Sequence, residues 1–351
     1  MSTYLQKVNE QTKTRMWVNN PTFEEAKFGL DAGCYGATTN PTYVGNMLKK
    51  PSMEATVIKT IDSHLKDSMD DHMVLSLTYQ DLVKTLAEIY MPLFEKTNGE
   101  QGWVAIQGNP NHDDDIDFIL DEAYRYYTIS PNIIVKLSAT ISGIAAMEKL
   151  TSQGYCAIGT AGVSNYYVCK MIEAYQRGCK KYKGSNHKMF VTSLAAPFEG
   201  FAKKYVASNN VDIDPKLVEA SGIEMSKKMY EIWEAKYSDS NAYLIGGGVR
   251  QGRHFTEMVA GDMHVTSGWS IIDELNAEDP PITDRVHEKL SDADIKELCE
   301  KIPAFKQAYL EDGLVSAELS TFPPFLMFKN NFLTSWDTVL SVIRERRLLL
   351  R

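Results

Sequence analysis

Short apolar runs rich in valine, isoleucine and aromatic residues alternate along the chain with longer segments whose apolar residues recur at helical spacing. Each short run ends in polar residues or glycine. Eight such runs cover residues 16–18, 35–39, 103–107, 133–137, 156–160, 189–193, 242–246 and 263–266. Strands that alternate with helices form parallel sheets. Eight of them in 351 residues favour an α/β fold of the (β/α)8 TIM-barrel type over a doubly wound sheet.

Two longer segments depart from this alternation. Residues 44–96 are too many for one crossover, so we expect two or three additional helices between the second and third strands. Residues 282–351 have a helical pattern that is broken at Pro303 and at Pro323-Pro324. We therefore expect one barrel domain over residues 1–351, with residues 282–351 as a C-terminal helical extension. This extension is expected either to cover the barrel or to supply a contact in a homodimer.

Composition and charge narrow the class of protein. The chain has 37 Lys plus Arg against 46 Asp plus Glu, a net charge of −9, which argues against nucleic acid or an anionic membrane surface as the main partner. Its five cysteines lack metal-ligand spacing and are expected to be free thiols. The N-terminus has no apolar signal core, and no run reaches the ~18 apolar residues of a membrane span. These features favour a cytoplasmic protein with small molecules or other subunits as partners.

The carboxyl ends of the strands are where a barrel of this type carries its site. The residues there are polar: Asn19, Asn40, Gln107, Lys136, Thr160, Ser193, Arg250 and Thr266. Lys136 stands in the most apolar of the eight runs, where burial would lower its pKa as a Schiff-base nucleophile requires. The same pattern fits a lysine that extends from a strand end into solvent.

These strand ends resemble those of the transaldolases, a family of class I Schiff-base aldolases. Asn40 lies in Thr-Thr-Asn-Pro-Thr, which is similar to the signature that follows the family's second strand. Val135-Lys-Leu-Ser-Ala-Thr140 resembles the motif that carries the Schiff-base lysine. Ile158-Gly-Thr-Ala-Gly-Val-Ser parallels a third motif and places Thr160 at the catalytic threonine.

The resemblance continues through the last two strands. Gly246-Gly-Gly-Val-Arg-Gln and Ala260-Gly-Asp-Met-His-Val-Thr are similar to the motifs found there. Because the matches run in order from about residue 15 to about residue 275, the chain is identified as a divergent member of the family.

The resemblance implies an activity. Lys136 would form a Schiff base with a ketose, a sugar phosphate or a related compound, and the C3–C4 bond would then be cleaved. The resulting three-carbon dihydroxyacetone unit would be released or transferred to an aldehyde acceptor. The iminium serves as the electron sink, so the resemblance implies no metal and no organic cofactor.

Two departures concern acid/base chemistry. The positions of the family's aspartate and glutamate, at the ends of strands one and three, hold Asn19 and Gln107. An amide keeps the shape of the acid but takes up no proton at neutral pH. An alternative interpretation is therefore a non-catalytic homologue that binds a sugar or another metabolite. A third interpretation is a different Schiff-base lyase that draws its general acid from Asp31, Asp262 or Glu199.

A further departure concerns phosphate recognition. The substrate-binding positions that the resemblance implies are Thr38, Ser164, Ala196, Phe198, Phe201 and Arg250. Ala196 and Phe201 stand where the family has a serine and an arginine that bind phosphate, which weakens the recognition of a phosphate dianion. Glu199, between them, is expected either to repel an anion or to point to solvent. Arg253 and His254 either rebuild an anion site with Arg250 or open a helix at the surface.

Overall fold

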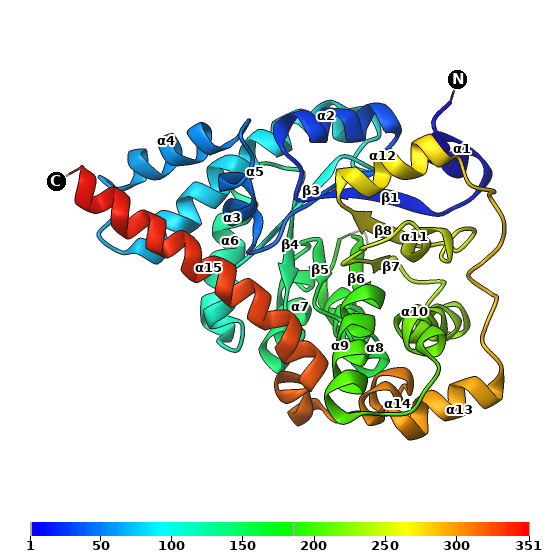
Figure 1. Cartoon of the computed structure of the whole chain (residues 1–351). Helices are drawn as coiled ribbons and strands as arrows, with labels where there is room; N and C mark the ends of the chain where they lie inside the picture. The colour runs from blue at the N-terminus through cyan, green and yellow to red at the C-terminus, as the bar shows by residue number, and fades with distance from the viewer. Residues whose placement is uncertain (1, 185–186, 351) are drawn as a thin grey trace.

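The strands close into a barrel of eight parallel strands in sequential order, as Figure 1 shows. The computed structural model describes residues 2–184 and 187–350, so the chain ends of the expected domain, residues 1 and 351, lie outside the described residues. The eight strands are β1 Arg15–Asn19, β2 Gly36–Thr38, β3 Trp103–Gln107, β4 Ile133–Leu137, β5 Ala157–Gly159, β6 Met189–Ser193, β7 Ala242–Gly246 and β8 His264–Ser267. The expected barrel is therefore confirmed, with strand bounds that differ by at most one residue.

Fifteen α-helices surround the strands in the described part of the chain. They are α1 Tyr4–Gln11, α2 Phe23–Ala32, α3 Tyr43–Leu48, α4 Glu54–His64, α5 Asp71–Lys96, α6 Ile116–Tyr127, α7 Ile141–Thr151, α8 Asn165–Lys181, α9 Ala195–Asn209, α10 Pro215–Lys236, α11 Arg253–Thr256, α12 Trp269–Glu278, α13 Asp292–Lys301, α14 Pro303–Tyr309 and α15 Pro323–Leu349. Two short 3-10 helices accompany them, η1 Pro110–His112 and η2 Ser316–Thr321. The segment between β2 and β3 holds α3, α4 and α5, which confirms the expected additional helices.

The interior of the barrel is filled by one apolar layer. Because side chains alternate between the two faces of a strand, every second residue points inward. The inward residues that cluster are Trp17, Tyr35, Ala105, Ile134, Ile158, Phe190 and Ile245. The Trp17 indole donates to His264 Nδ1 at 2.9 Å, and burial lowers the pKa of His264 to about 3, so this histidine is neutral. This layer is a solid floor beneath the mouth of the barrel.

The C-terminal segment differs in part from its expected form. Residues 282–291 are not helical. Helix α13 begins only after Ser291, whose side chain caps it by accepting a hydrogen bond from the backbone N–H of Asp294. Pro303 and Pro323 do break the pattern, and each stands at the first turn of a new helix, where a missing N–H has no cost.

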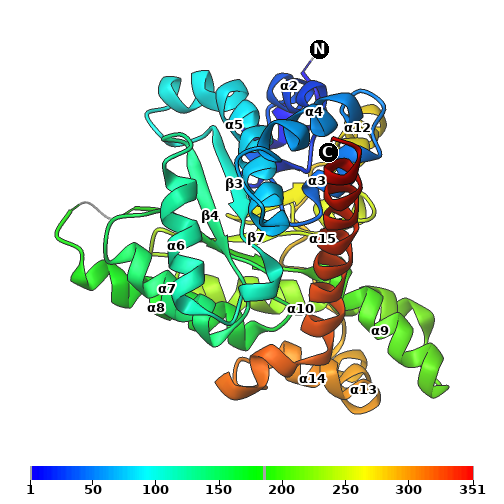
Figure 2. The same ribbon diagram turned by 90° about the vertical axis from the view of Figure 1, so that its left-hand side faces the viewer.

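The last helix, α15, lies across several parts of the barrel. Figure 1 shows it in orange and red, crossing the molecule from the side of α14 to the side of α4, and Figure 2 shows it running beside α3. It contacts α3, α4, α5, α9 and η1. Arg346 pairs with both carboxylate oxygens of Asp62, at 2.8 and 2.5 Å, and the Trp336 indole donates to His72 Nδ1 at 3.1 Å. These contacts anchor α15 along its length.

Gly36 is the position where we expect the barrel wall to tolerate no side chain. A Cβ atom there would lie 2.4 Å from the backbone oxygen of Trp103 and 3.0 Å from the Trp17 ring. We predict that Gly36→Ala lowers the free energy of unfolding by about 1–3 kcal/mol because neither neighbour can move away. Urea unfolding measures the change. Gly200→Ala is the matched control: this exposed α9 position has nothing within 4 Å, and alanine should stabilise the helix by up to about 1 kcal/mol. Equal stabilities of the two variants would contradict this description of the wall.

Candidate active site

A cavity of about 320 Å³ opens at the carboxyl ends of the strands. It is called the mouth cavity below. Part of its floor comes from the second inward layer, two residues beyond the apolar one, which supplies Asn19, Lys136, Thr160, Thr192 and Gly247. The described residues that line it are Asn19, Asn20, Asn40, Thr42, Asn46, Lys136, Thr160, Thr192, Leu194, Gly247, Gly248, Arg250, Thr266, Phe328, Asn331 and Phe332. None of these is a carboxylate, and the two cationic residues among them are Lys136 and Arg250.

Lys136 is positioned by the alternation of strand β4. Ile134 points into the apolar layer, and the side chain two residues on therefore points into the mouth. Lys136 is buried, and its amine donates to the backbone oxygen of Thr39 at 3.1 Å. Burial lowers its pKa from 10.5 to about 7. Because no carboxylate opposes this shift, a large share of the amine is neutral and nucleophilic near neutral pH.

The two amides that replace the expected acids sit in different surroundings. Asn19 Oδ1 accepts a hydrogen bond from Thr38 at 3.0 Å, and the Thr38 hydroxyl lies 2.6 Å from that of Thr266. Since Thr38 donates to Asn19, Thr266 donates to Thr38. Thr38 is buried and orients Asn19 and Thr266 rather than lining the mouth cavity. Gln107 is the register partner of Lys136, and it too lies outside the lining of the mouth cavity.

The loops after β1 and β2 add amides to the wall. Asn40 Oδ1 accepts from both the backbone N–H and the hydroxyl of Thr42, at 3.0 and 2.7 Å, so Asn40 can serve a ligand through its NH2 group. Asn20 adopts a left-handed backbone with φ of 47°. Such a conformation costs of order 1–3 kcal/mol for a non-glycine residue and is concentrated at functional sites. Asn20 is not among the site residues expected from the sequence, although it directly follows Asn19.

Helix α15 contributes the side of the mouth cavity that the strand ends do not supply. Phe328, Asn331 and Phe332 line it from this helix. No local motif around these residues indicates a site, because their position depends on how a helix distant in sequence crosses the barrel. The anchor nearest to them is an ion pair between Lys329 and Asp113, whose side chains are 16% and 9% exposed.

A second cavity of about 330 Å³ adjoins the mouth cavity and shares Arg250, Phe328 and Asn331 with it. Glu199 lines this neighbour and is buried rather than solvated. Its carboxylate contacts Arg253 at 2.6 Å, Lys203 at 2.8 Å and His254 at 3.0 Å. Burial alone would raise the pKa of Glu199, but the hydrogen bonds from His254 and Lys203 and the charge of Arg253 hold it at about 2.

The contacts of Glu199 correct the expectations for this region. Arg253 and His254 do not form a free anion site with Arg250, since the anion that they bind is Glu199 of the same chain. Glu199 neither points to solvent nor carries an unopposed charge, because three basic side chains surround it.

Four other expected substrate-binding residues, besides Thr38, do not line the mouth cavity. Ser164 is the N-cap of α8 and accepts a hydrogen bond from the backbone N–H of Tyr167. Phe198 packs on Phe305, and Phe201 stacks on Tyr205, because this face of α9 is directed away from the mouth. Ala196 lines only the neighbouring cavity.

Two of the three candidate general acids lie away from the mouth. Asp31 is near the end of α2, which precedes β2, and Asp262 pairs with Lys13 just before β8. Residues that precede a strand belong to the amino end of the barrel, opposite the site. Within the described residues, no group of three or more His, Cys, Asp and Glu side chains is arranged to hold a metal ion. None of the described helices combines the length and apolar character that crossing a membrane requires.

A closed (β/α)8 barrel with a polar site at the carboxyl end of its strands is the architecture shared by barrel enzymes. The family model described as Transaldolase/Fructose-6-phosphate aldolase matches residues 17–322, and the chain belongs to this family.

Relatives named transaldolase are similar to the chain at low identity. That of Acidothermus cellulolyticus is 23% identical over 216 residues, which are 61% of this chain and 54% of the relative. That of Neisseria meningitidis serogroup A is 22% identical over 231 residues, 64% of each chain. That of Thiobacillus denitrificans is 28% identical over 162 residues, 46% of this chain and 44% of the relative. The chain thus spans less than two thirds of the length of each of these relatives.

We predict that Lys329→Met lowers the free energy of unfolding by about 1–3 kcal/mol at neutral pH, because it leaves the buried Asp113 carboxylate without its cation. Burial already raises the pKa of Asp113 against the opposing effect of Lys329. Removing the lysine raises this pKa further, so the deficit should shrink as the pH falls and Asp113 becomes protonated. Chemical unfolding at several pH values measures it. Lys296→Met, at a side chain that is 75% exposed, should change little. A deficit independent of pH would contradict the role given to the ion pair.

Proposed function

We propose that this protein is a Schiff-base aldolase or transferase that acts on a ketose and releases or transfers a three-carbon dihydroxyacetone unit. The observation that carries the proposal is the buried Lys136 amine, which lines the mouth cavity and has a pKa lowered to about 7. Family membership supports the same reaction class.

The proposed reaction begins with addition of the neutral Lys136 amine to the ketose carbonyl. The resulting carbinolamine loses water to give an iminium. Cleavage of the C3–C4 bond then leaves its electron pair on C3, delocalised into the iminium, and the C4 hydroxyl loses its proton as an aldehyde forms. The three-carbon unit adds to an acceptor aldehyde, or takes up a proton and is released by hydrolysis. The first step needs an unprotonated amine, which the burial of Lys136 favours.

The walls of the mouth cavity suit a hydroxylated substrate. Asn19, Asn40 and Asn331 offer amides, and Thr160 and Thr192 offer hydroxyl groups. These groups both donate and accept hydrogen bonds, as sugar hydroxyls do. Arg250, where this cavity meets its neighbour, is a cation suited to one anionic group on the substrate. We propose that Thr160, Asn40 and Asn19 contact the reacting end and that Arg250 contacts the far end.

The alternative function is binding of a sugar or another metabolite without turnover. The observation that favours it is the amide at positions 19 and 107, where the resemblance implies acids. Under this alternative, a ketose binds in calorimetry but no aldehyde is released or transferred. Asn19→Asp combined with Gln107→Glu would then restore activity that the natural chain lacks.

Borohydride trapping tests the proposal. Incubation with dihydroxyacetone or fructose 6-phosphate followed by borohydride should leave a stable adduct on Lys136, identified by peptide mapping. Lys136→Met should abolish the adduct, whereas Lys188→Met should not, because Lys188 pairs with Glu100 outside the mouth cavity. The failure of folded wild-type protein to form an adduct with any of a broad panel of ketoses would refute the proposed function.

The pH dependence of trapping reports the lysine pKa. The rate should rise with a midpoint near pH 7, because only the neutral amine attacks. Gln107→Glu should move this midpoint upward by about 1–2 pH units. Position 107 is the register partner of Lys136, and a carboxylate there would stabilise the ammonium form of the lysine. Gln107→Leu, which adds no charge, should not raise it. An unchanged midpoint in Gln107→Glu would show that position 107 is not electrostatically coupled to Lys136.

A further inference from the structure

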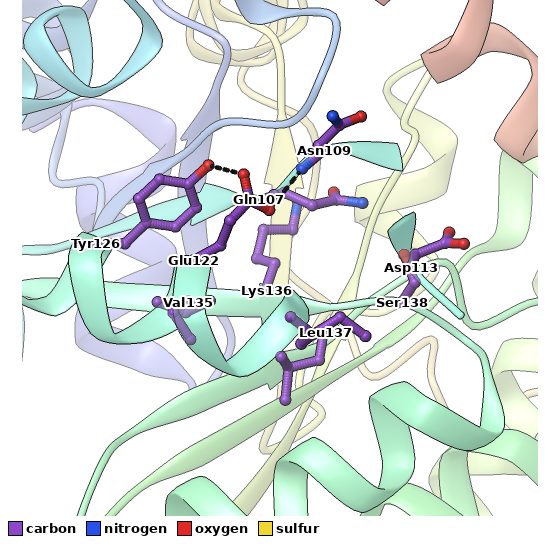
Figure 3. Close-up of a pocket in the computed structure, with 12 residues that line it drawn as sticks. Gln107, Asn109, Asp113, Glu122, Tyr126, Val135, Lys136, Leu137 and Ser138 are labelled. Carbon is purple, nitrogen blue, oxygen red and sulfur yellow. Dashed lines mark hydrogen bonds between the residues drawn. The ribbon is translucent and has the colours of Figure 1, made fainter. Parts of the chain in front are cut away.

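A small cavity lies between strands β3 and β4 and helix α6, and Figure 3 shows it in close-up. Its volume is about 20 Å³, and its polar lining includes Gln107, Asn109, Glu122, Tyr126 and Lys136. Lys136 is the one described residue that lines both this cavity and the mouth cavity. The small cavity therefore adjoins the lysine on which the proposed Schiff base forms.

Glu122 is a buried carboxyl held in this cavity by two donors. It accepts a hydrogen bond from the backbone N–H of Asn109 at 2.9 Å and another from the Tyr126 hydroxyl at 3.0 Å, drawn as dashed lines in Figure 3. Burial raises the pKa of Glu122, although these two hydrogen bonds oppose the shift. Among the residues that line the small cavity with Lys136, Glu122 and Asp113 are the carboxyls, and Asp113 is neutralised by Lys329.

The backbone is shaped to admit the Glu122 carboxyl. A Cβ atom on Gly108 would lie 2.2 Å from Glu122 Oε2. Only glycine therefore allows the carboxyl to approach the end of β3, directly beside Gln107. Glu122 is not among the site residues expected from the sequence, because it lies on helix α6 and not at a strand end.

Gln107 supplies the second polar wall of the cavity. It is 2% exposed, and its Oε1 atom has no hydrogen-bond partner within the described part of the chain. A buried acceptor of this kind is normally satisfied by a donor. A cavity of about 20 Å³ has room for one water, which needs two to four polar partners. Gln107 Oε1 and Glu122 are two such partners, so the pair fits a bound water molecule.

The charged and titratable groups around Glu122 lie on α5, α6, β4 and the segment after η1. They are Tyr79 and, through Asn109, His72 on α5; Asp121, Arg125 and Tyr126 on α6; Asp113 after η1; and Lys136 on β4. Arg125 favours the carboxylate form of Glu122 and Asp121 opposes it. The tyrosines keep their protons, because burial raises the pKa of Tyr79 and Tyr126 well above the usual value. Glu122 is thus the group in this set that can exchange a proton towards Lys136.

We propose that Glu122 is the proton reservoir for Schiff-base formation at Lys136 and acts through a water bound between its carboxyl and Gln107. The inference rests on the proposed function. The Glu122 carboxyl gives a proton to this water, which passes one to the carbinolamine hydroxyl. The C–O bond breaks, water leaves, and the nitrogen lone pair forms the C=N bond of the iminium. Glu122 is left as a carboxylate and regains its proton when hydrolysis of the iminium runs these steps in reverse.

The proposal also explains why an amide at position 107 suits this site. A carboxylate at the end of β3 would stand beside Lys136 itself, whereas Gln107 can hold a water without carrying charge. The proposed acid, Glu122, lies instead on α6, where it lines the small cavity and not the mouth cavity.

The test compares Glu122→Gln with Asp121→Asn, a matched change at the adjacent and 73% exposed position of the same helix. The readout is the rate of adduct formation with dihydroxyacetone under borohydride, as a function of pH. Wild type should lose rate on the alkaline side as Glu122 gives up its proton. Glu122→Gln should lose that alkaline limb and fall by about 10²-fold at its optimum, the size of a general acid/base contribution. Glu122→Asp should recover part of the rate. Asp121→Asn should keep the wild-type rate at the optimum and move the alkaline limb only slightly to lower pH, because exposed Asp121 is the weakest of the influences on Glu122.

Gly108→Ala tests the same role of Glu122 should Glu122→Gln fail to fold. Gly108→Ala leaves the carboxyl in the chain but displaces it, and should cause the same loss of the alkaline limb. If wild type forms the adduct and Glu122→Gln matches its rate and pH profile per folded molecule, the inference is overturned while the proposed function stands. If wild type forms no adduct at all, both are overturned.

Discussion

The site depends on one amine held out of water with no counter-charge. Lys136 donates to a single backbone oxygen, and no carboxylate lines the mouth cavity in the described residues. The shift of its pKa from 10.5 to about 7 corresponds to about 5 kcal/mol. Since the folded state binds the proton less tightly than the unfolded chain, this amount destabilises the fold below pH 7 and is regained as the pH rises towards 10.5. Other interactions in the fold must offset this free-energy cost, and they include the packing of the apolar layer beneath Lys136 and of the helices around the barrel.

The chain as a whole is acidic, but the described lining of its mouth cavity carries only positively charged and neutral side chains. The chain carries a net charge of −9, yet the mouth cavity is lined by neutral amides and hydroxyls with Lys136 and Arg250. Two carboxyls that line cavities adjoining it are each held by neighbouring groups. Glu199 is surrounded by Arg253, His254 and Lys203, and Glu122 is buried behind the strands beside Gly108. A carboxylate beside Lys136 would favour its ammonium form, so a mouth cavity without carboxylates in its described lining leaves the lowered pKa of Lys136 unopposed.

Much of the fold could be predicted from the sequence because its signals are local. The eight apolar runs correspond to the eight strands, and alternation within a strand is enough to aim Asn19, Lys136 and Thr160 at the mouth. Residues on helices were less predictable. The motif that contains Ala196 and Phe201 lies on α9, whose rotation directs Phe198 and Phe201 away from the cavity. Phe328 and Asn331 reach the site only because α15 crosses the barrel, and Glu122 reaches Gly108 only because α6 packs on β4, the neighbour of β3. Such placements depend on contacts between segments far apart in the chain, which no spacing within one segment encodes.

A direct titration of Lys136 tests the central claim. Protein labelled with ¹³C at the lysine Cε can be followed by NMR as the pH is raised, and the Lys136 signal is assigned by its loss in Lys136→Met. We expect this signal to titrate near pH 7, while exposed lysines titrate near their ordinary 10.4. A Lys136 signal that titrates with the exposed lysines would contradict the account, because the amine would then be solvated or paired with a carboxylate and would not be a nucleophile at neutral pH.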